Sequence, residues 1–403
     1  MQLRLALRNV FRNRRRTAFS LAVIIVGTSI FLFLLGFIGE ALNSTKQSLA
    51  CETGAVQVGD ERLFENKADG YEYLIAPELR AEVVELVNTQ PGVVGVAWEL
   101  NFAGLVGDET GSTLILGRGV VPCNCIQNYE CLIIDGEELS EDDSRETILG
   151  ARLAAKLGVG PGDRINIATG TVSGNFNAAT VNVVGTLTYS FETIEEQLGL
   201  FSVAFVQRLL KTDGVERIII GLEDLDKAGT FAEVLQKTLD DAGIPLVTRT
   251  WEQLNQAYES LSTFYTAFSG LAGVAVFALV FFSVVEVLTL SFLERTKEVG
   301  TLRAIGTSRA RIFRTFLLEG ILLGLIGAAL GTLIGVLVAI TFNLIGFEWT
   351  PPGAAIPQAL RLSVDSTTIL IPFITAILAT LTSALYPAWK SARQRIVEAL
   401  QSV

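Results

Sequence analysis

Four apolar stretches, each long enough to cross a lipid bilayer, constrain this chain more than any other feature of its sequence. They cover residues 17–38, 265–292, 315–345 and 367–388. A helix needs about 20 apolar residues to span the hydrocarbon core of a bilayer. Charged residues make up 18% of the 403-residue chain, which is low for a soluble protein. The sequence therefore predicts four transmembrane helices.

The first apolar stretch follows Arg14–Arg16, as the hydrophobic region of a secretory signal would. It is longer than such a region, and no small-x-small cleavage site closes it. We therefore expect a retained membrane helix over residues 17–40. Before it, residues 1–16 predict an amphipathic helix whose arginines lie at the lipid phosphates, an interpretation compatible with a plain basic anchor.

Positive charge is distributed unevenly along the chain. Residues 1–16, 293–314 and 389–403 together hold 15 Lys or Arg and 3 Asp or Glu, whereas residues 40–264 hold 15 and 35. Short basic loops stay in the cytoplasm. We therefore expect both termini and the 293–314 loop on the cytoplasmic side of the bacterial inner membrane. The 41–264 domain and the 346–366 loop are expected on its outer side. An acidic outer domain argues against nucleic acid as a partner.

The segment between the first two spans has the composition of a soluble domain of about 225 residues. Apolar periodicity and turn residues predict both helices and strands in it, so we expect an α+β domain. The expected helices cover residues 76–89, 146–157 and 225–242, and the expected strands cover 93–98, 113–121, 164–168, 180–188, 217–222 and 245–250. Residues 251–264 are polar enough to form a stalk leading into the second span.

All four cysteines belong to the outer domain: Cys51, Cys123, Cys125 and Cys131. An oxidising compartment favours disulfides, for which four cysteines allow three connectivities. Free thiols are the second interpretation. A zinc site would need four thiolates because the chain contains no histidine, an unusual choice outside the cytoplasm. We therefore expect no metal.

Two further features lie inside or beside the apolar stretches. Gly320 and Gly324 form one small-xxx-small row, and Gly327, Gly331 and Gly335 form another. Such rows let helices approach closely, either within one chain or across a dimer seam. Two carboxylates, Glu286 and Glu319, also need partners because a buried acid is costly in a membrane. Glu286 is expected either to pair with Arg309, Arg311 or Arg314 or to extend towards the cytoplasmic surface, and a proton relay is a third interpretation. Glu319 is expected to form a structural salt bridge.

Three motifs resemble those of the MacB, LolC/LolE and FtsX class of ABC transporter permeases, the mechanotransmission or type VII group. They are LALRNVFRNRRRT at residues 5–17, ILGARLAAKLGVGPGDRI at 148–165, and ERTKEVGTLRAIGTSRARI with FLLEG at 294–312 and 316–320. The third motif is the most specific. The order of one helix, a large domain and three helices also matches.

The resemblance implies a MacB-like periplasmic core domain and a dimer, formed with a second copy or a paralogous permease. It implies two separate cytoplasmic ATPase subunits, which would carry the ATP and Mg²⁺. No G-x-x-x-x-G-K-[ST] motif occurs here, so we expect no cofactor on this chain and no enzymatic activity of its own. A membrane-fusion or lipoprotein-acceptor protein is a further expected partner.

The 293–314 loop is the candidate coupling element. Glu294–Ile305 predicts a short helix ended by Gly306, with apolar and charged faces. We expect it to dock in a groove of the ATPase and to relay the closure of the ATPases outward. The candidate residues are Glu294, Arg295, Glu298, Leu302, Arg303, Ala304, Ile305 and Gly306; a plain positive-inside loop is the alternative interpretation.

The expected function is export or extraction of a lipoprotein, lipid-like, peptide or drug substrate. The alternative is an FtsX-like signalling subunit that activates a cell-wall hydrolase without transport. The size of the outer domain favours transport, because signalling members of the class usually have a smaller one. No catalytic constellation is found in the sequence, which has no histidine for a triad.

Overall fold

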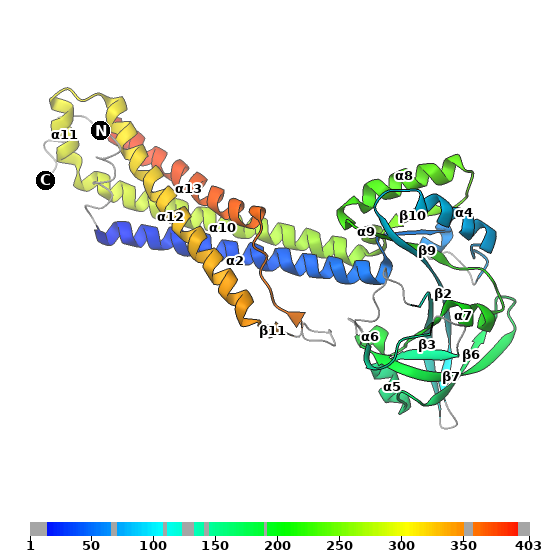
Figure 1. Cartoon of the computed structure of the whole chain (residues 1–403). Helices are drawn as coiled ribbons and strands as arrows, with labels where there is room; N and C mark the ends of the chain where they lie inside the picture. The colour runs from blue at the N-terminus through cyan, green and yellow to red at the C-terminus, as the bar shows by residue number, and fades with distance from the viewer. Residues whose placement is uncertain are drawn as a thin grey trace. The chain divides into compact units, whose positions relative to one another are not determined.

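The computed structural model describes residues 14–65, 71–107, 111–122, 133–140, 145–188, 192–349 and 358–393. The chain divides into two compact units (Figure 1). The helical unit comprises Met1–Asn43, Leu261–Glu348 and Ala359–Val403, and the α+β unit comprises Ser44–Ser260 and Trp349–Gln358.

Four long helices confirm the predicted membrane spans. They are α2 (Arg14–Thr53), α10 (Gln256–Glu294), α12 (Arg309–Ile345) and α13 (Ser366–Arg393), and each contains a window long and apolar enough to cross a membrane. The first two are longer than the sequence predicted. At 1.5 Å per residue, the 40 residues of α2 extend about 60 Å, roughly twice the thickness of a bilayer core. Both α2 and α10 therefore continue beyond their apolar parts.

The glycines of α12 let two neighbouring helices approach it closely. Gly320 and Gly324 face α13, where a side-chain carbon at Gly324 would lie 2.0 Å from the Thr380 hydroxyl oxygen. Gly327, Gly331 and Gly335 face α2. The Ser29 hydroxyl of α2 donates a hydrogen bond to the Gly331 carbonyl at 2.8 Å. Helices of the same chain thus occupy both small-residue rows.

An apolar core joins all four long helices of the helical unit. Small residues of α13 meet branched side chains of the other helices there, which permits dense packing in the absence of a strong hydrophobic driving force between helices. The buried members are Ile24, Val280, Val284, Leu288, Leu323, Ala328, Ala376, Ala379 and Ala384.

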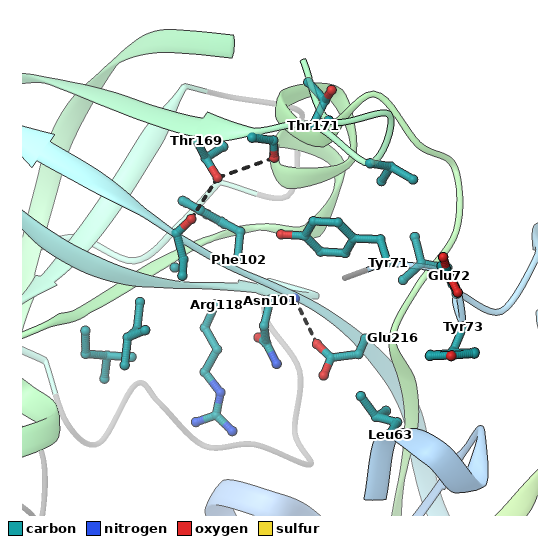
Figure 2. Close-up of a pocket in the computed structure, with 18 of the residues that line it drawn as sticks. Leu63, Tyr71, Glu72, Tyr73, Asn101, Phe102, Arg118, Thr169, Thr171 and Glu216 are labelled. Atoms are coloured by element: carbon teal, nitrogen blue, oxygen red, sulfur yellow. Dashed lines mark hydrogen bonds between the residues drawn. The ribbon is translucent and has the colours of Figure 1, made fainter. Parts of the chain in front are cut away.

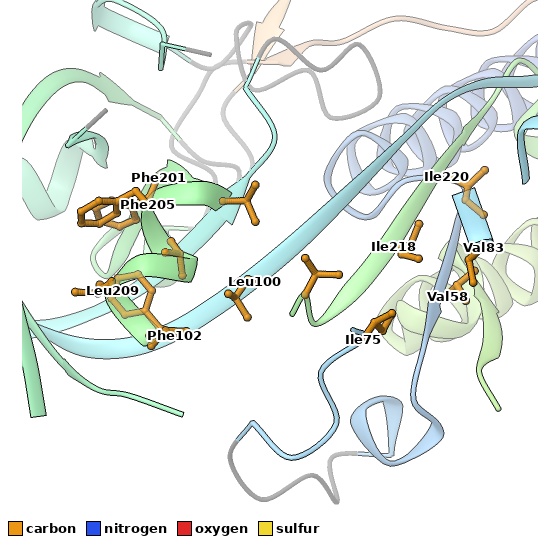
Figure 3. Packing of buried hydrophobic residues seen from close by; sticks show 14 of the residues in the cluster. Val58, Ile75, Val83, Leu100, Phe102, Phe201, Phe205, Leu209, Ile218 and Ile220 are labelled. Carbon is orange, nitrogen blue, oxygen red and sulfur yellow. The ribbon is translucent and has the colours of Figure 1, made fainter. Parts of the chain in front are cut away.

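The α+β unit contains two sheets that share one long strand, β2 (Val93–Gly107). In the first sheet, the order is β10 (Val247–Thr250), β1 (Val56–Gly59), β9 (Arg217–Leu222) and the first half of β2, all antiparallel. Helices α4 (Pro77–Asn88) and α8 (Ala228–Asp241) belong to this half. Figure 3 shows Val58, Ile75, Val83, Ile218 and Ile220 gathered in its core.

The second half of β2 begins a sheet whose pairings close on themselves. The ring runs from β2 through β3 (Ser112–Val120), β8 (Leu198–Ser202), β5 (Glu146–Gly150), β7 (Phe176–Leu187) and β6 (Arg164–Gly170) back to β2. A short strand, β4 (Ile133–Gly136), also pairs with β7. Closure removes free strand edges from the ring.

Aromatic packing fills one side of this ring. Phe201 of β8 lies between Phe102 of β2 and Phe205 of α7 (Val203–Leu210), with ring centroids 5.5 and 5.6 Å away (Figure 3). The remaining short elements are α3 (Glu61–Phe64), α5 (Ala151–Leu157), α6 (Glu192–Glu195), η2 (Leu225–Lys227), α9 (Trp251–Leu254), α11 (Thr296–Ala304), β11 (Glu348–Trp349) and β12 (Gln358–Ala359).

The α+β class is confirmed, but one predicted helix is wrong in its first half. Residues 146–150 form β5, and the helix α5 starts only at Ala151 before Gly158 ends it with a φ of +69°. Thr147 to Gly150 are all buried, so the strand shows no alternation that would distinguish it from a helix. The sequence missed β1 and β8 for the same reason, since every residue in them is buried.

Several predictions fall outside the described residues. These are the amphipathic helix before Arg14 and the three cysteines Cys123, Cys125 and Cys131. Cys51 lies near the end of α2. The disulfide interpretation therefore stays a prediction. Among the residues that the structure describes, no group of three or more His, Cys, Asp or Glu could hold a metal ion.

We predict that Gly331→Ala destabilises the helical unit. The added carbon would lie 2.9 Å from the carbonyl oxygen of Ile25 and 3.1 Å from its Cα, so α2 itself would have to move. We expect a loss of about 1–3 kcal/mol, seen as a lower midpoint of thermal unfolding in detergent. The matched control is Gly270→Ala in α10, where nothing lies within 4 Å. Equal midpoints for the two variants would contradict the close packing.

Candidate coupling site

The segment between α10 and α12 makes two sharp turns around the short helix α11, and we call residues 295–306 the coupling knuckle. Arg295 leaves helical geometry with φ −104° and ψ 13°, which separates α10 from α11. At the other end Gly306 has a φ of +100°, a conformation that favours glycine. The Thr307 amide then donates to the Leu302 carbonyl at 3.0 Å and closes the last turn.

One face of the knuckle is buried against the helical unit. Val299 is 5% exposed and packs in a small apolar cluster. Phe292 and Phe316 of this cluster form an edge-to-face pair with centroids 6.0 Å apart. The other buried members are Ile312 and Ala388. The knuckle is thereby packed against the ends of α10, α12 and α13.

An ion pair lies beside this cluster. The carboxylate of Glu319 in α12 is buried, and the Arg295 guanidinium donates to it at 2.9 Å. Arg295 also approaches Glu298 at 3.3 Å, and its guanidinium carbon lies 5.6 Å from the centre of the Phe316 ring. A buried carboxylate needs a paired cation, and Arg295 supplies it.

A second arginine of the knuckle also points inward. The Arg303 guanidinium donates a hydrogen bond to the backbone carbonyl of Ala392 at 3.0 Å. Ala392 lies next to the last described residue of α13. Arg303 thus connects the knuckle to α13.

The opposite face of the knuckle is exposed and partly apolar. Leu302 is 49% exposed and Ile305 is 79% exposed. Glu294, Glu298, Ala304 and Gly306 are exposed as well. Of the eight residues chosen from the sequence, Arg295 and Arg303 thus bind within the helical unit and Glu298 pairs with Arg295, whereas the side chains of Leu302, Ala304 and Ile305 are exposed.

Glu286 differs from Glu319. It is exposed on α10 and forms no ion pair with any residue in the described part of the chain. The arginines of the basic loop that the sequence offered as its partners therefore do not reach it here.

A cavity of about 1010 Å³ lies where the two sheets of the α+β unit meet (Figure 2). Its walls are mostly apolar and aromatic, with contributions from Tyr71, Tyr73, Phe102 and Leu198. Arg118 lines it and is paired at 3.5 Å with the fully buried carboxylate of Glu99, a residue beneath the wall. A cavity of this size and lining is typical of sites for an apolar ligand or side chain.

Two polar groups of the cavity wall are fixed in place. The Glu216 carboxylate accepts a hydrogen bond from the backbone N–H of Asn101 at 3.2 Å, as Figure 2 shows. Burial, together with the nearby charge of Glu216, raises the pKa of Tyr71 to about 12.

Two helix ends belong to the α+β unit and are fastened to it. Lys46 of α2 pairs with Asp226 and lies 5.9 Å over the ring of Trp251, which is 1% exposed. The Trp251 amide donates to the Ala55 carbonyl at 3.0 Å, and Tyr258 packs against the Trp251 ring at 4.8 Å. The predicted polar stalk over 251–264 is thus corrected: its first residues form the anchored helix α9, and α10 begins only at Gln256.

Two models of known protein families match the chain. Residues 17–238 match the model of the MacB-like periplasmic core domain, and residues 270–396 match that of the FtsX-like permease C-terminal region. The chain belongs to the FtsX-like permeases with a MacB-like periplasmic core domain. The α+β unit is this periplasmic core, and the knuckle lies within the FtsX-like region.

Relatives of this permease are ABC transporter components. The lipoprotein-releasing system transmembrane protein LolC of Xylella fastidiosa is 25% identical over 340 residues, which are 79% of this chain and 80% of LolC. The macrolide export ATP-binding/permease protein MacB of Campylobacter jejuni is 24% identical over 368 residues, 86% of this chain and 54% of MacB. The chain is thus an ABC transporter permease.

Among solved structures, the periplasmic region of MacB from Actinobacillus actinomycetemcomitans matches with a TM-score of 0.39 and 12% identity. The match covers 51% of this chain and 93% of that structure.

Sequence reasoning missed the buried anchors of the knuckle in this permease. The sequence analysis did not single out Val299, Phe292 or Phe316. Val299 lies three residues after Thr296, so the two share one face of α11, and both are buried. The Arg295–Glu319 pairing was also missed, because Glu319 lies 24 residues further along the chain. Packing of the end of α10 against α12 brings Arg295 and Glu319 together.

We predict a large loss of stability for one acidic substitution in the knuckle and almost none for another. Val299→Asp would place a carboxylate in the apolar cluster and should destabilise the permease by about 3 kcal/mol. Ile305→Asp changes an exposed side chain and should alter the unfolding free energy by less than about 0.5 kcal/mol. Thermal unfolding of both purified variants in detergent tests this. An equally stable Val299→Asp variant would show that the inner face is not buried.

Proposed function

We propose that this permease couples ATP hydrolysis by two separate cytoplasmic ATPase subunits to movement of its periplasmic core. The observation that carries the proposal is the exposed apolar pair Leu302 and Ile305 on a helix whose opposite face is buried. Exposed apolar side chains next to charged ones are typical of a docking surface for a partner protein.

The charge distribution supports a cytoplasmic position for this surface. The knuckle shares the 293–314 loop with three further arginines, Arg309, Arg311 and Arg314. The segments expected inside the cell hold 15 basic and 3 acidic residues, which is the asymmetry that retains loops in the cytoplasm. In this topology, both termini lie inside and the α+β unit lies in the periplasm.

The fastening of α2 and α10 to the periplasmic core supports transmission of a movement. A displacement of either helix acts on the core through Lys46, Trp251 and Tyr258, whose contacts belong to one compact unit. A packed joint of this kind moves as a body between discrete arrangements.

The permease would assemble with a second permease copy or a paralogue and with two ATPases, which bind the ATP and Mg²⁺. Its own sequence has no Walker A motif. The cargo we propose is a lipoprotein or another lipid-like, peptide or drug molecule that is extracted or exported. Two observations support this class: the relatives named for lipoprotein release and for macrolide export, and the largely apolar cavity of the periplasmic core.

We predict that Leu302→Asp and Ile305→Asp uncouple the permease from its ATPase. Each places a charge where an apolar contact is expected, which should weaken docking by about 2 kcal/mol, or roughly 30-fold in Kd. The measurement is ATP hydrolysis by the complex purified through a tag on the permease and reconstituted in lipid. Leu302→Met, which keeps an apolar side chain of similar volume, is the matched control.

Full ATP hydrolysis and an unchanged amount of bound ATPase in both Asp variants would contradict the docking role. A wild-type permease that never carries an ATPase through purification would contradict the proposed function as a whole.

The topology gives a separate prediction. Green fluorescent protein fused after Val403 should fluoresce in intact cells, because it folds in the cytoplasm and fails to fold after export through the general secretion pathway. The same protein inserted in the α+β unit at the turn Gly160–Asp163 should stay dark. The reverse pattern would place the knuckle outside and overturn the proposal.

A further inference from the structure

The knuckle helix is too short to be stable by itself. It has nine residues, whereas isolated helices of fewer than about 12–15 residues are marginal in water. Its first turn has no side-chain cap, and Gly300 in its interior weakens it further. The orientation of its exposed face therefore depends on contacts with the neighbouring helices.

Arg295 provides the tie to α12. It stands at the junction of α10 and α11, yet its strongest contact is the 2.9 Å hydrogen bond to Glu319 in α12. Charge-assisted hydrogen bonds from arginine are directional as well as strong. Because Glu319 is buried in the helix bundle, it cannot follow the knuckle without moving α12.

Arg303 provides the tie to α13. Its 3.0 Å hydrogen bond reaches a backbone carbonyl, so the acceptor moves with α13 itself and does not depend on a second side chain. The two ties lie at opposite ends of α11 and go to different helices.

We propose that Arg295 and Arg303 are positioning residues for coupling. They fasten the knuckle to α12 and α13, so that force applied by the ATPase to Leu302 and Ile305 moves these helices together with α10. Without the ties, the knuckle would turn about Arg295 and Gly306 and absorb the displacement. The inference rests on the proposed function, and it separates docking, which the outer face performs, from transmission, which the inner ties perform.

The test uses the whole complex, purified through a tag on the permease and reconstituted in lipid, with three variants: Arg295→Gln, Glu319→Gln and Arg303→Ala. We expect the amount of bound ATPase to stay within twofold of the wild type. We expect the permease-dependent kcat for ATP to fall at least tenfold in Arg295→Gln and Glu319→Gln, with an unchanged KM. Arg303→Ala should lower kcat less, because it removes a hydrogen bond to the uncharged carbonyl of Ala392, whereas the other two variants break an ion pair.

Two further variants distinguish a tie from a general effect on folding. The double variant Arg295→Gln/Glu319→Gln replaces both charges of the pair with amides, so it carries the test if Arg295→Gln, which removes the cation paired with the buried Glu319 carboxylate, fails to fold. Its loss of kcat should equal that of a single variant and not the product of both, as expected for residues that act as one pair. Lys297→Gln removes an exposed charge from the same helix and should leave kcat unchanged.

Two results would overturn the inference while leaving the proposed function intact. One is wild-type kcat in properly folded Arg295→Gln, Glu319→Gln and double variants. The other is loss of the ATPase from these variants, which would assign the pair to docking. Failure of the wild-type permease to bind or stimulate an ATPase is a different outcome and would instead remove the proposed function.

Discussion

The close approach of α12 to its neighbours is the contact on which the rest of the helical unit depends. Glycines on two faces of α12 bring α2 and α13 against its backbone, and the Ser29–Gly331 hydrogen bond fixes one of these contacts. In a membrane, lipid tails compete equally well for apolar side chains, so helices associate through tight packing of small residues. The same helix carries Glu319 near its start, and its position therefore determines where the knuckle is held.

The knuckle combines two kinds of surface in twelve residues. Its inner side meets an apolar cluster and two fixed acceptors, Glu319 and the Ala392 carbonyl. Its outer side presents Leu302 and Ile305 among charged residues. A loop retained only for its positive charge would not need a buried valine or an arginine paired inside the bundle. The division between the two sides is thus the structural argument for a coupling role, and the family membership agrees with it.

The long apolar helices were predictable from the sequence, whereas the short buried strands were not. The four membrane helices follow from apolar length alone, and the coupling helix was expected at 294–305, close to α11. The strand at 146–150 was taken for a helix because Thr147 to Gly150 are all buried, which removes the alternation of an ordinary strand. The inward roles of Arg295 and Arg303 depend on partners 24 and 89 positions away, and spacing within one helix carries no information about them.

The shared strand β2 has a consequence for the cavity of the periplasmic core. One wall of this cavity contains Tyr71 and Glu216 and lies on the side of the first sheet. The other wall contains Arg118 and Thr169, which belong to the closed ring of strands (Figure 2). Because β2 belongs to both sheets, a change in its curvature would change the distance between these two walls. By thermodynamic linkage, any occupant that prefers one curvature also stabilises it. Occupancy of the cavity and the curvature of β2 would then be coupled.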